Sequence, residues 1–229
     1  MSQIRIALLA AIAIVLALAS QAHAQMWNSS NGTTWNNPMS SLASTMITGN
    51  MMQQAMKDSF AQQGAQQGAQ GQGQAAPSHF AIAKSDFVSS GKRIMIEPLI
   101  NSLTQAPQQR ADLAKGVGQV FAMYEAKVRK NNVAYAMAFM AGMAVLADKG
   151  ITLTDQQGEN LALALNDQLA ANPAFVKASA VDRQKLYETF VTMGSLIAIF
   201  NEVGKKDAAS AAAAKQFATE AYKLMGLTK

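Results

Sequence analysis

The stretch 131–147 (NNVAYAMAFMAGMAVLA) contains no charged residue, and it limits the possible folds of this chain more than any other feature. A helix this apolar is buried, either in a membrane or in a protein core. The stretch is shorter than the roughly 20 residues that span a bilayer, and its Ala and Gly residues are only weakly apolar. Small residues recur at every fourth position (Ala134, Ala138, Gly142), beside a bulkier face (Tyr135, Phe139, Met143). We therefore expect the central helix of a helical core.

The sequence from about Ser85 onward has helical periodicity throughout, with most Pro and Gly residues between the periodic runs. The clearest apolar stripe alternates steps of four and three residues: Leu186, Phe190, Met193, Ile197 and Phe200. We expect helices over Ser89–Leu103 (kinked or divided at Pro98), from Pro107 past Tyr124, and over 131–148, 154–171, 179–204 and 207–225. No alternating run is long enough for a strand. The sequence predicts an all-α fold, a single compact bundle of about five to six helices.

Capping residues predict where several of these helices begin and end. Asn131 or Asn132, Thr154 and Ser179 have the side-chain oxygens that accept a hydrogen bond from the first helical turn. Gly150 and Gly226 follow the ends of periodic runs, where glycine commonly adopts the left-handed conformation.

The N-terminus has the three parts of a secretory signal peptide: a positive end, a short apolar core and small residues before a cleavage point. The apolar run Ile6–Ala19 is too short to favour a membrane anchor. Ala22 and Ala24 occupy the two small-residue positions, so we expect cleavage before Gln25. The sequence predicts a signal peptide over 1–24 and an exported protein, periplasmic or secreted, without stable membrane insertion after cleavage.

Two further segments precede the helical region. Residues 25–60 form a polar extension that contains several methionines, Trp27 and Trp35. Residues 61–79 are rich in Gln, Gly and Ala and lack large apolar side chains, so we expect a disordered, flexible linker. The predicted helical domain covers residues 80–229.

Composition and charge exclude some classes of function. The formal net charge is +5, but the basic residues are scattered and form no dense stripe interleaved with aromatics. We therefore expect no nucleic-acid partner. The chain has no cysteine, so disulfides, cysteine catalysis and a lipid on cysteine are all excluded, and the fold has to depend on its own core.

Side chains suited to catalysis are sparse. His23 falls in the predicted signal peptide and His79 at the linker border, and no phosphate-binding glycine loop is present. Two carboxylates on a helical scaffold can cleave glycosidic bonds. Asp155 and Glu159 lie one turn apart, but their position at the start of a helix is explained by the helix dipole. We predict no catalytic residue, metal site or cofactor, and keep a carboxylate-dependent cell-wall or polysaccharide hydrolase as the alternative.

The methionines of the extension support a minor alternative. Thioether sulfurs bind Cu(I), and the potential ligands are Met46, Met51, Met52 and Met56, with His79 downstream. Met52, Met56 and Phe60 are spaced by four residues. This spacing favours a short amphipathic helix that packs on the domain or on a partner.

Polar side chains within apolar helices predict a hydrogen-bonded network, because buried polar groups need partners. The candidates are Glu125, Arg129, Gln168, Gln184, Tyr187 and Glu188. Glu125 and Arg129 have the spacing of an intrahelical ion pair, and Gln184 and Glu188 share a helix face. We interpret the network as structural, with a binding cleft as the alternative.

Three segments resemble an uncharacterised family of exported bacterial all-helical domains: Tyr124–Arg129 (YEAKVR), Asn131–Ala136 (NNVAYA) and Asp182–Glu188 (DRQKLYE), the last leading into the apolar run Phe190–Phe200. The resemblance covers roughly residues 85–227. It implies a secreted or periplasmic domain of unknown function and brings no catalytic residue with it. We expect a non-enzymatic module that binds an unknown protein or another component of the cell envelope.

Overall fold

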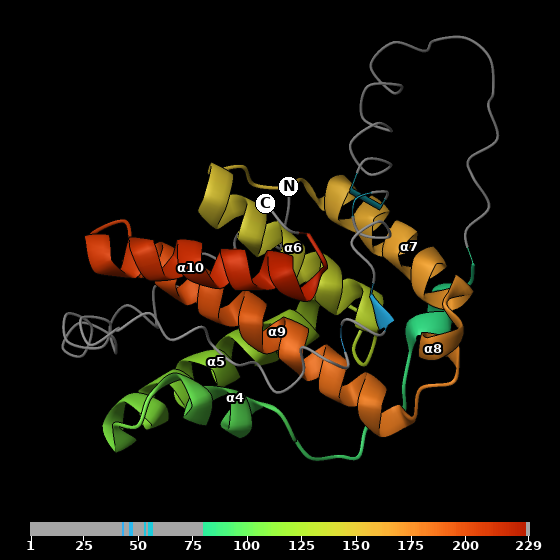
Figure 1. The fold of residues 1–229 in the computed structure, drawn as a ribbon, viewed down its shortest axis with the longest axis horizontal. Helices are drawn as coiled ribbons and strands as arrows, with labels where there is room; N and C mark the ends of the chain where they lie inside the picture. The colour runs from blue at the N-terminus through green and yellow to red at the C-terminus, as the bar shows by residue number, and fades with distance from the viewer. Residues whose placement is uncertain (1–42, 44–45, 48–52, 54, 57–79, 228–229) are drawn as a thin grey trace, which may run out of the picture.

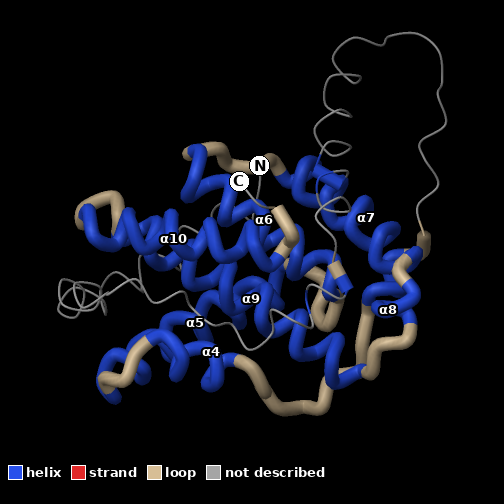
Figure 2. Tube along the Cα trace, in the orientation of Figure 1, coloured by secondary structure: helices blue, strands red, loops and turns tan. Residues whose placement is uncertain are grey.

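The computed structural model describes residues 43, 46–47, 53, 55–56 and 80–227 (Figure 1). Its elements are the 3-10 helix η1 (Ile82–Ser85) and the α-helices α4 (Ile96–Leu103), α5 (Pro107–Lys127), α6 (Val133–Lys149), α7 (Asp155–Ala171), α8 (Pro173–Val176), α9 (Ala180–Val203) and α10 (Ala208–Leu224). The described residues contain no strand (Figure 2). The predicted all-α fold is confirmed, with the single turn of α8 added to six longer helices within these residues.

Helix α9 lies at the centre of the fold and packs against α4, α5, α6 and α10 (Figure 1). Its predicted stripe from Leu186 to Phe200 is buried, as expected for a core helix. Helix α6 packs against α7, α9 and α10, which confirms that the uncharged stretch belongs to the core. Among the described residues, no helix is both long and apolar enough to cross a membrane.

Most of the predicted helix ends are confirmed, because the capping side chains make the expected bonds. Asn132, Thr154, Ser179 and Asp207 each accept a hydrogen bond from a backbone N–H in the first turn of the helix that follows. At Thr154 the bond is reciprocal, since the Gln157 side chain accepts from the Thr154 N–H. Gly150 has a φ of 68°, the left-handed conformation that ends α6.

The prediction of a helix over Ser89–Leu103 is wrong in its first half. Helix α4 begins at Ile96, and Pro98 lies in its first turn, where a missing N–H has no cost. Residues 89–95 instead form an irregular segment, which we call the strap. Its backbone groups are bound by side chains of α9 rather than by a helical turn.

The predicted intrahelical pair of Glu125 and Arg129 is also wrong. Helix α5 ends at Lys127, and Val128 is extended, with φ −122° and ψ 157°. Arg129 therefore leaves the helix axis and binds Asp86, at 2.9 Å and 2.5 Å. Glu125 pairs with Arg93 of the strap at 2.6 Å.

Part of the methionine-containing extension belongs to the hydrophobic core. Ala43, Met46, Ile47 and Ala55 are buried in it, and Met56 packs against it. The side-chain amide of Asn172, just before α8, donates to the Met46 carbonyl at 2.9 Å. Met46 and Met56 therefore act as apolar side chains that pack in or against the core. Other parts of the prediction lie outside the described residues: the signal peptide, the linker, Trp27, Trp35, Met51, Met52, Phe60 and His79.

Candidate functional site

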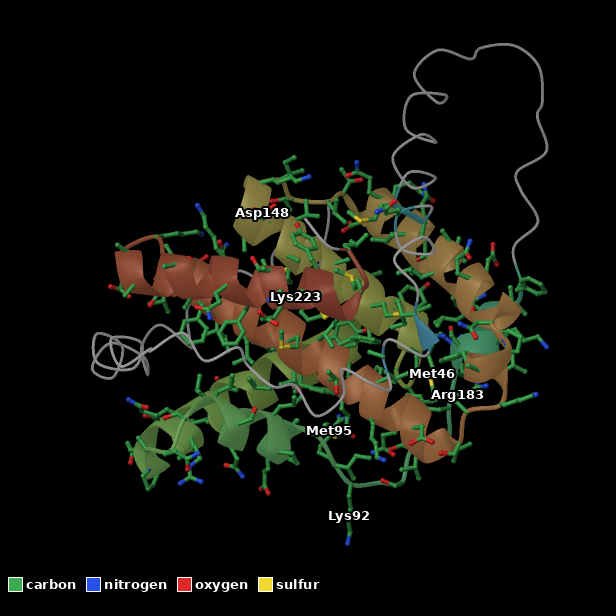
Figure 3. All side chains as sticks on the ribbon, viewed as in Figure 1. Met46, Lys92, Met95, Asp148, Arg183 and Lys223 are labelled. Carbon is green, nitrogen blue, oxygen red and sulfur yellow. The ribbon has the colours of Figure 1, made fainter. Side chains whose placement is uncertain are left out.

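The predicted polar residues Gln184 and Glu188 hold the strap against α9. The fully buried Glu188 carboxylate accepts the backbone N–H groups of Ile94 and Met95 through Oε2, at 2.7 Å and 2.8 Å. Its other oxygen accepts from the Gln184 amide at 2.7 Å. Gln184 also accepts from the Ser90 N–H and donates to the Lys92 carbonyl. The Lys92 side chain points away from the fold, while Met95 lies at the start of α4 (Figure 3).

Glu125 and Tyr187 form a second cluster beside the first. The Tyr187 hydroxyl donates to Glu125 at 2.9 Å, and the Arg93 guanidinium lies 4.0 Å above the Phe121 ring centre while it pairs with Glu125. Burial, together with the Glu125 carboxylate, raises the pKa of Tyr187 well above its ordinary value. The strap is thus attached to α5 as well as to α9.

The other two predicted residues lie elsewhere. Arg129 binds Asp86 and, through hydrogen bonding, lowers the pKa of that carboxyl group below its usual value. Gln168 is half-buried on α7, which packs against η1, α6 and α8. The structure therefore brings together Glu125, Gln184, Tyr187 and Glu188 around the strap and separates Arg129 and Gln168 from them.

Sequence analysis did not single out Arg183, which connects three elements. Its guanidinium donates to the carbonyls of Lys84 and Asp86 near η1 and to those of Phe175 and Val176 at α8. It also lies 4.4 Å above the Phe175 ring centre. These contacts are structural, because all four acceptors are backbone carbonyls of the domain.

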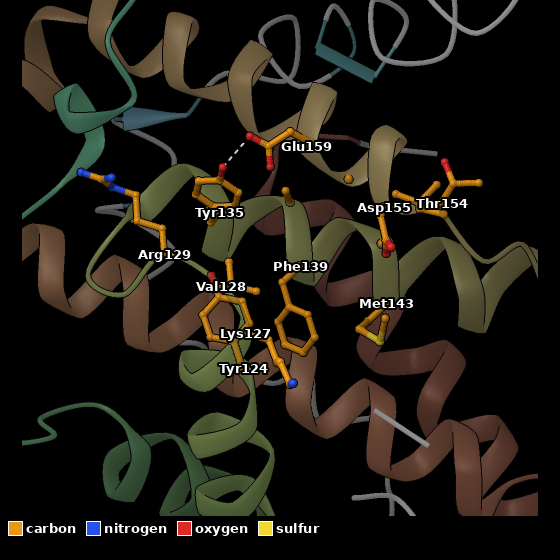
Figure 4. Close-up of a pocket in the computed structure, with 14 residues that line it drawn as sticks. Tyr124, Lys127, Val128, Arg129, Tyr135, Phe139, Met143, Thr154, Asp155 and Glu159 are labelled. Carbon is orange, nitrogen blue, oxygen red and sulfur yellow. Dashed lines mark hydrogen bonds between the residues drawn. The ribbon is translucent and has the colours of Figure 1, made fainter. Parts of the chain in front are cut away.

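A groove of about 270 Å³ lies where the end of α5, the middle of α6 and the start of α7 meet (Figure 4). We call it the α5–α7 groove. Its apolar lining consists of Val128, Ala138, Phe139, Gly142, Met143, Leu153 and Gly158. Its polar lining consists of Tyr124, Lys127, Arg129, Tyr135, Thr154, Asp155 and Glu159. An apolar floor with a few charged groups at the rim is typical of small-molecule sites.

Two tyrosines contribute to the groove in different ways. The Tyr135 hydroxyl donates to Glu159 across the gap between α6 and α7, at 2.6 Å. Burial and this hydrogen bond raise the pKa of Tyr135, so its hydroxyl remains protonated. Tyr124 is 6% exposed, and its hydroxyl has no hydrogen-bond partner among the described residues. The buried hydroxyls of Thr189 and Thr192 on α9 also lack a partner among the described residues, so this feature is not specific to the groove.

The carboxylates of the groove are limited in what they can do. Asp155 is the first residue of α7 and Glu159 follows one turn later, so both extend from the same wall. Glycoside hydrolysis needs two carboxyl groups that flank the bond to be cleaved. The facing wall, at the end of α5, carries Lys127 instead. The described residues also contain no group of three or more His, Asp or Glu side chains that could hold a metal ion.

The periodicity of the sequence identifies the α6 face that lines the groove, but predicts that this face is buried in the core. Tyr135, Phe139 and Met143 were expected as the bulky face of a buried helix, and the structure leaves all three half-buried along the groove. No sequence pattern predicts that Lys127 lines the groove, because its position there depends on where α5 ends.

Comparison with the curated proteins and with the solved structures gave no match. A family model matches residues 3–227, which is wider than the expected 85–227 and takes in the methionine-containing extension and the Gln/Gly-rich tract. The match covers nearly the whole chain. The chain therefore belongs to the Family of unknown function (DUF6683).

Proposed function

We propose that this chain is an exported, non-enzymatic binding module of the cell envelope whose recognition site is the α5–α7 groove. The observation that carries the proposal is the lining of the groove, an apolar floor with charged and aromatic side chains at its edge. This arrangement suits a ligand with an apolar body and a polar end. The contacts around the strap and around Arg183 are internal to the domain, so they leave the groove as the best candidate.

Blocking the groove should abolish binding of a neutral apolar probe. Gly158 lines the groove, and a Cβ added there meets no atom within 4 Å, so we expect Gly158→Trp to fold and to place its ring in the groove. We expect the full chain to raise the fluorescence of N-phenyl-1-naphthylamine saturably, and Gly158→Trp to weaken binding by about tenfold or more.

Gly118→Trp is the matched control for this experiment. Gly118 is an exposed glycine of α5 outside the groove lining, and it also has no atom within 4 Å of an added Cβ. This variant should bind the probe as the unmodified chain does. Equal binding by the unmodified chain and Gly158→Trp, or no binding by the unmodified chain, would count against the proposal.

A hydrolase is the second candidate, because Asp155 and Glu159 both line the groove. Their position on one wall argues against it, since neither faces the other across a bound sugar. If purified chain clears a suspension of cell-wall polysaccharide and Asp155→Asn with Glu159→Gln abolishes the clearing, the hydrolase replaces the binding module.

The proposal of export is based on the signal-peptide pattern of residues 1–24. We expect the chain to be recovered outside the cytoplasm with Gln25 as its first residue, as measured by intact mass. Ala24→Arg should block cleavage, because the peptidase accepts only small side chains at that position. Full-length chain retained in the cytoplasm would overturn this part of the proposal.

A further inference from the structure

The α5–α7 groove is locally acidic, although the chain is basic overall. Asp155 and Glu159 supply two negative charges on the α7 wall. Arg129 forms an ion pair with Asp86, which lies outside the lining, and Lys127 supplies the other positive charge of the groove. The four charges of the lining sum to zero, and with Asp86, the partner of Arg129, the formal charge is −1, on a chain of formal net charge +5. A local reversal of sign favours a ligand of the opposite charge.

Aromatic faces reinforce this preference. The rings of Tyr124 and Phe139 lie 5.0 Å apart at 41°, and both belong to the groove lining together with Tyr135. An organic cation is attracted to the negative face of such rings, and more strongly where water is excluded. Burial, followed by the neighbouring Tyr187 and the Glu125 carboxylate, raises the pKa of Tyr124 well above its ordinary value, so the ring remains neutral.

The hydroxyl of Tyr124 takes no part in this recognition. Its side chain is more than nine-tenths buried in the wall of the groove, and its hydroxyl has no partner among the described residues. The hydroxyl oxygen is itself buried, so Tyr124 contributes its ring to the groove rather than a hydrogen bond to a ligand. Figure 4 shows Tyr124 beside Phe139 and Lys127, with Glu159 and Asp155 on the side of α7.

From these observations we infer that the groove selects a small organic cation, an ammonium group carried on an apolar or aromatic body. The inference rests on the proposed function and specifies its ligand class. The ammonium group lies near Asp155 and Glu159, and the apolar body covers Phe139 and Met143. A volume of about 270 Å³ lies just below the roughly 300–1,000 Å³ of pockets for drug-sized molecules, so the ligand is small.

Three probes of nearly equal size and different charge test the inference: 3-phenylpropylammonium, 3-phenylpropan-1-ol and 3-phenylpropanoate. The Met143 methyl group, which lines the groove, is the local reporter in an NMR titration of the full, methyl-labelled chain, assigned with Met143→Leu. We expect the cation to bind about fivefold or more tightly than the alcohol, and the anion to bind most weakly. Added salt should reduce the preference, because the rim charges are exposed.

Variants that remove charges test the α7 wall and the α5 wall of the groove one at a time. Asp155→Asn combined with Glu159→Gln should lower the affinity for the cation to that for the alcohol, so that the preference disappears. Gln at position 159 still accepts the Tyr135 hydroxyl. Lys127→Gln should raise the affinity for the cation, because it removes a positive charge from the lining.

The outcomes distinguish this inference from the proposed function. If the alcohol or the anion binds as tightly as the cation, or if no probe shifts Met143 while N-phenyl-1-naphthylamine still binds, the choice of a cation is wrong and the binding groove stands. If N-phenyl-1-naphthylamine also fails to bind, the proposed function fails with it.

Discussion

Replacing Glu188 with alanine should lower the free energy of unfolding by about 4 kcal/mol. The substitution leaves three donors without their acceptor: the N–H groups of Ile94 and Met95 and the side-chain amide of Gln184. Each buried donor that loses its partner costs about 1–3 kcal/mol, and the cavity left by the side chain adds to this. Urea denaturation of the full chain, followed by circular dichroism, measures the loss.

Two further variants show whether the hydrogen bonds cause this loss. Glu188→Gln keeps the shape but places an NH₂ group against one of the three donors, so we expect an intermediate loss of about 2 kcal/mol. Glu202→Ala removes a carboxylate near the other end of α9, where the residue pairs with the exposed Lys205, and should cost about 1 kcal/mol. A loss in Glu188→Ala no larger than that in Glu202→Ala would show that Glu188 does not hold the strap.

The Glu188 contacts also explain where sequence analysis failed. Helix ends such as Thr154 and Ser179 were predictable, because a capping residue acts on N–H groups two or three positions away. The strap was predicted as helix, because its structure is decided by Glu188, 94 residues from Ile94 in the chain. Ser90-Gly91 is a local turn signal, and Gly91 has a φ of 80°, but no local pattern in residues 89–95 points to Glu188.

The candidate site was predictable only in part, for a related reason. The periodicity of α6 correctly placed Tyr135, Phe139 and Met143 on one face. Whether that face meets another helix or borders a groove depends on the end of α5 at Lys127 and on the approach of α7. The bond from Tyr135 to Glu159 joins two helices whose relative placement has no signature in the sequence.

The second large effect is expected at Gly204, between α9 and α10. Glycine was predicted there as a helix stop, and α9 does end there, but Gly204 has φ −60° and ψ −17°, which any residue adopts. The reason for glycine is space: an added Cβ would lie 2.6 Å from Cα and 2.7 Å from the backbone N of Ala211. Because backbone atoms cannot rotate away, Gly204→Ala has to displace the start of α10, and we expect a loss of about 3 kcal/mol in urea denaturation.

Gly194 and Gly118 provide the comparison that isolates this cause. An added Cβ at Gly194 would meet the Phe139 ring at 2.6 Å and the Met140 Cα at 3.3 Å, so its closest contact is with a side chain, at the border of the groove, rather than with backbone. Gly194→Ala should therefore cost less than half as much as Gly204→Ala. Gly118→Ala has open space in the middle of α5 and should stabilise the chain by about 0.5–1 kcal/mol, because alanine favours the helix. If Gly204→Ala is as stable as Gly118→Ala, α10 does not approach Gly204 as closely as described, and helix termination alone accounts for the glycine.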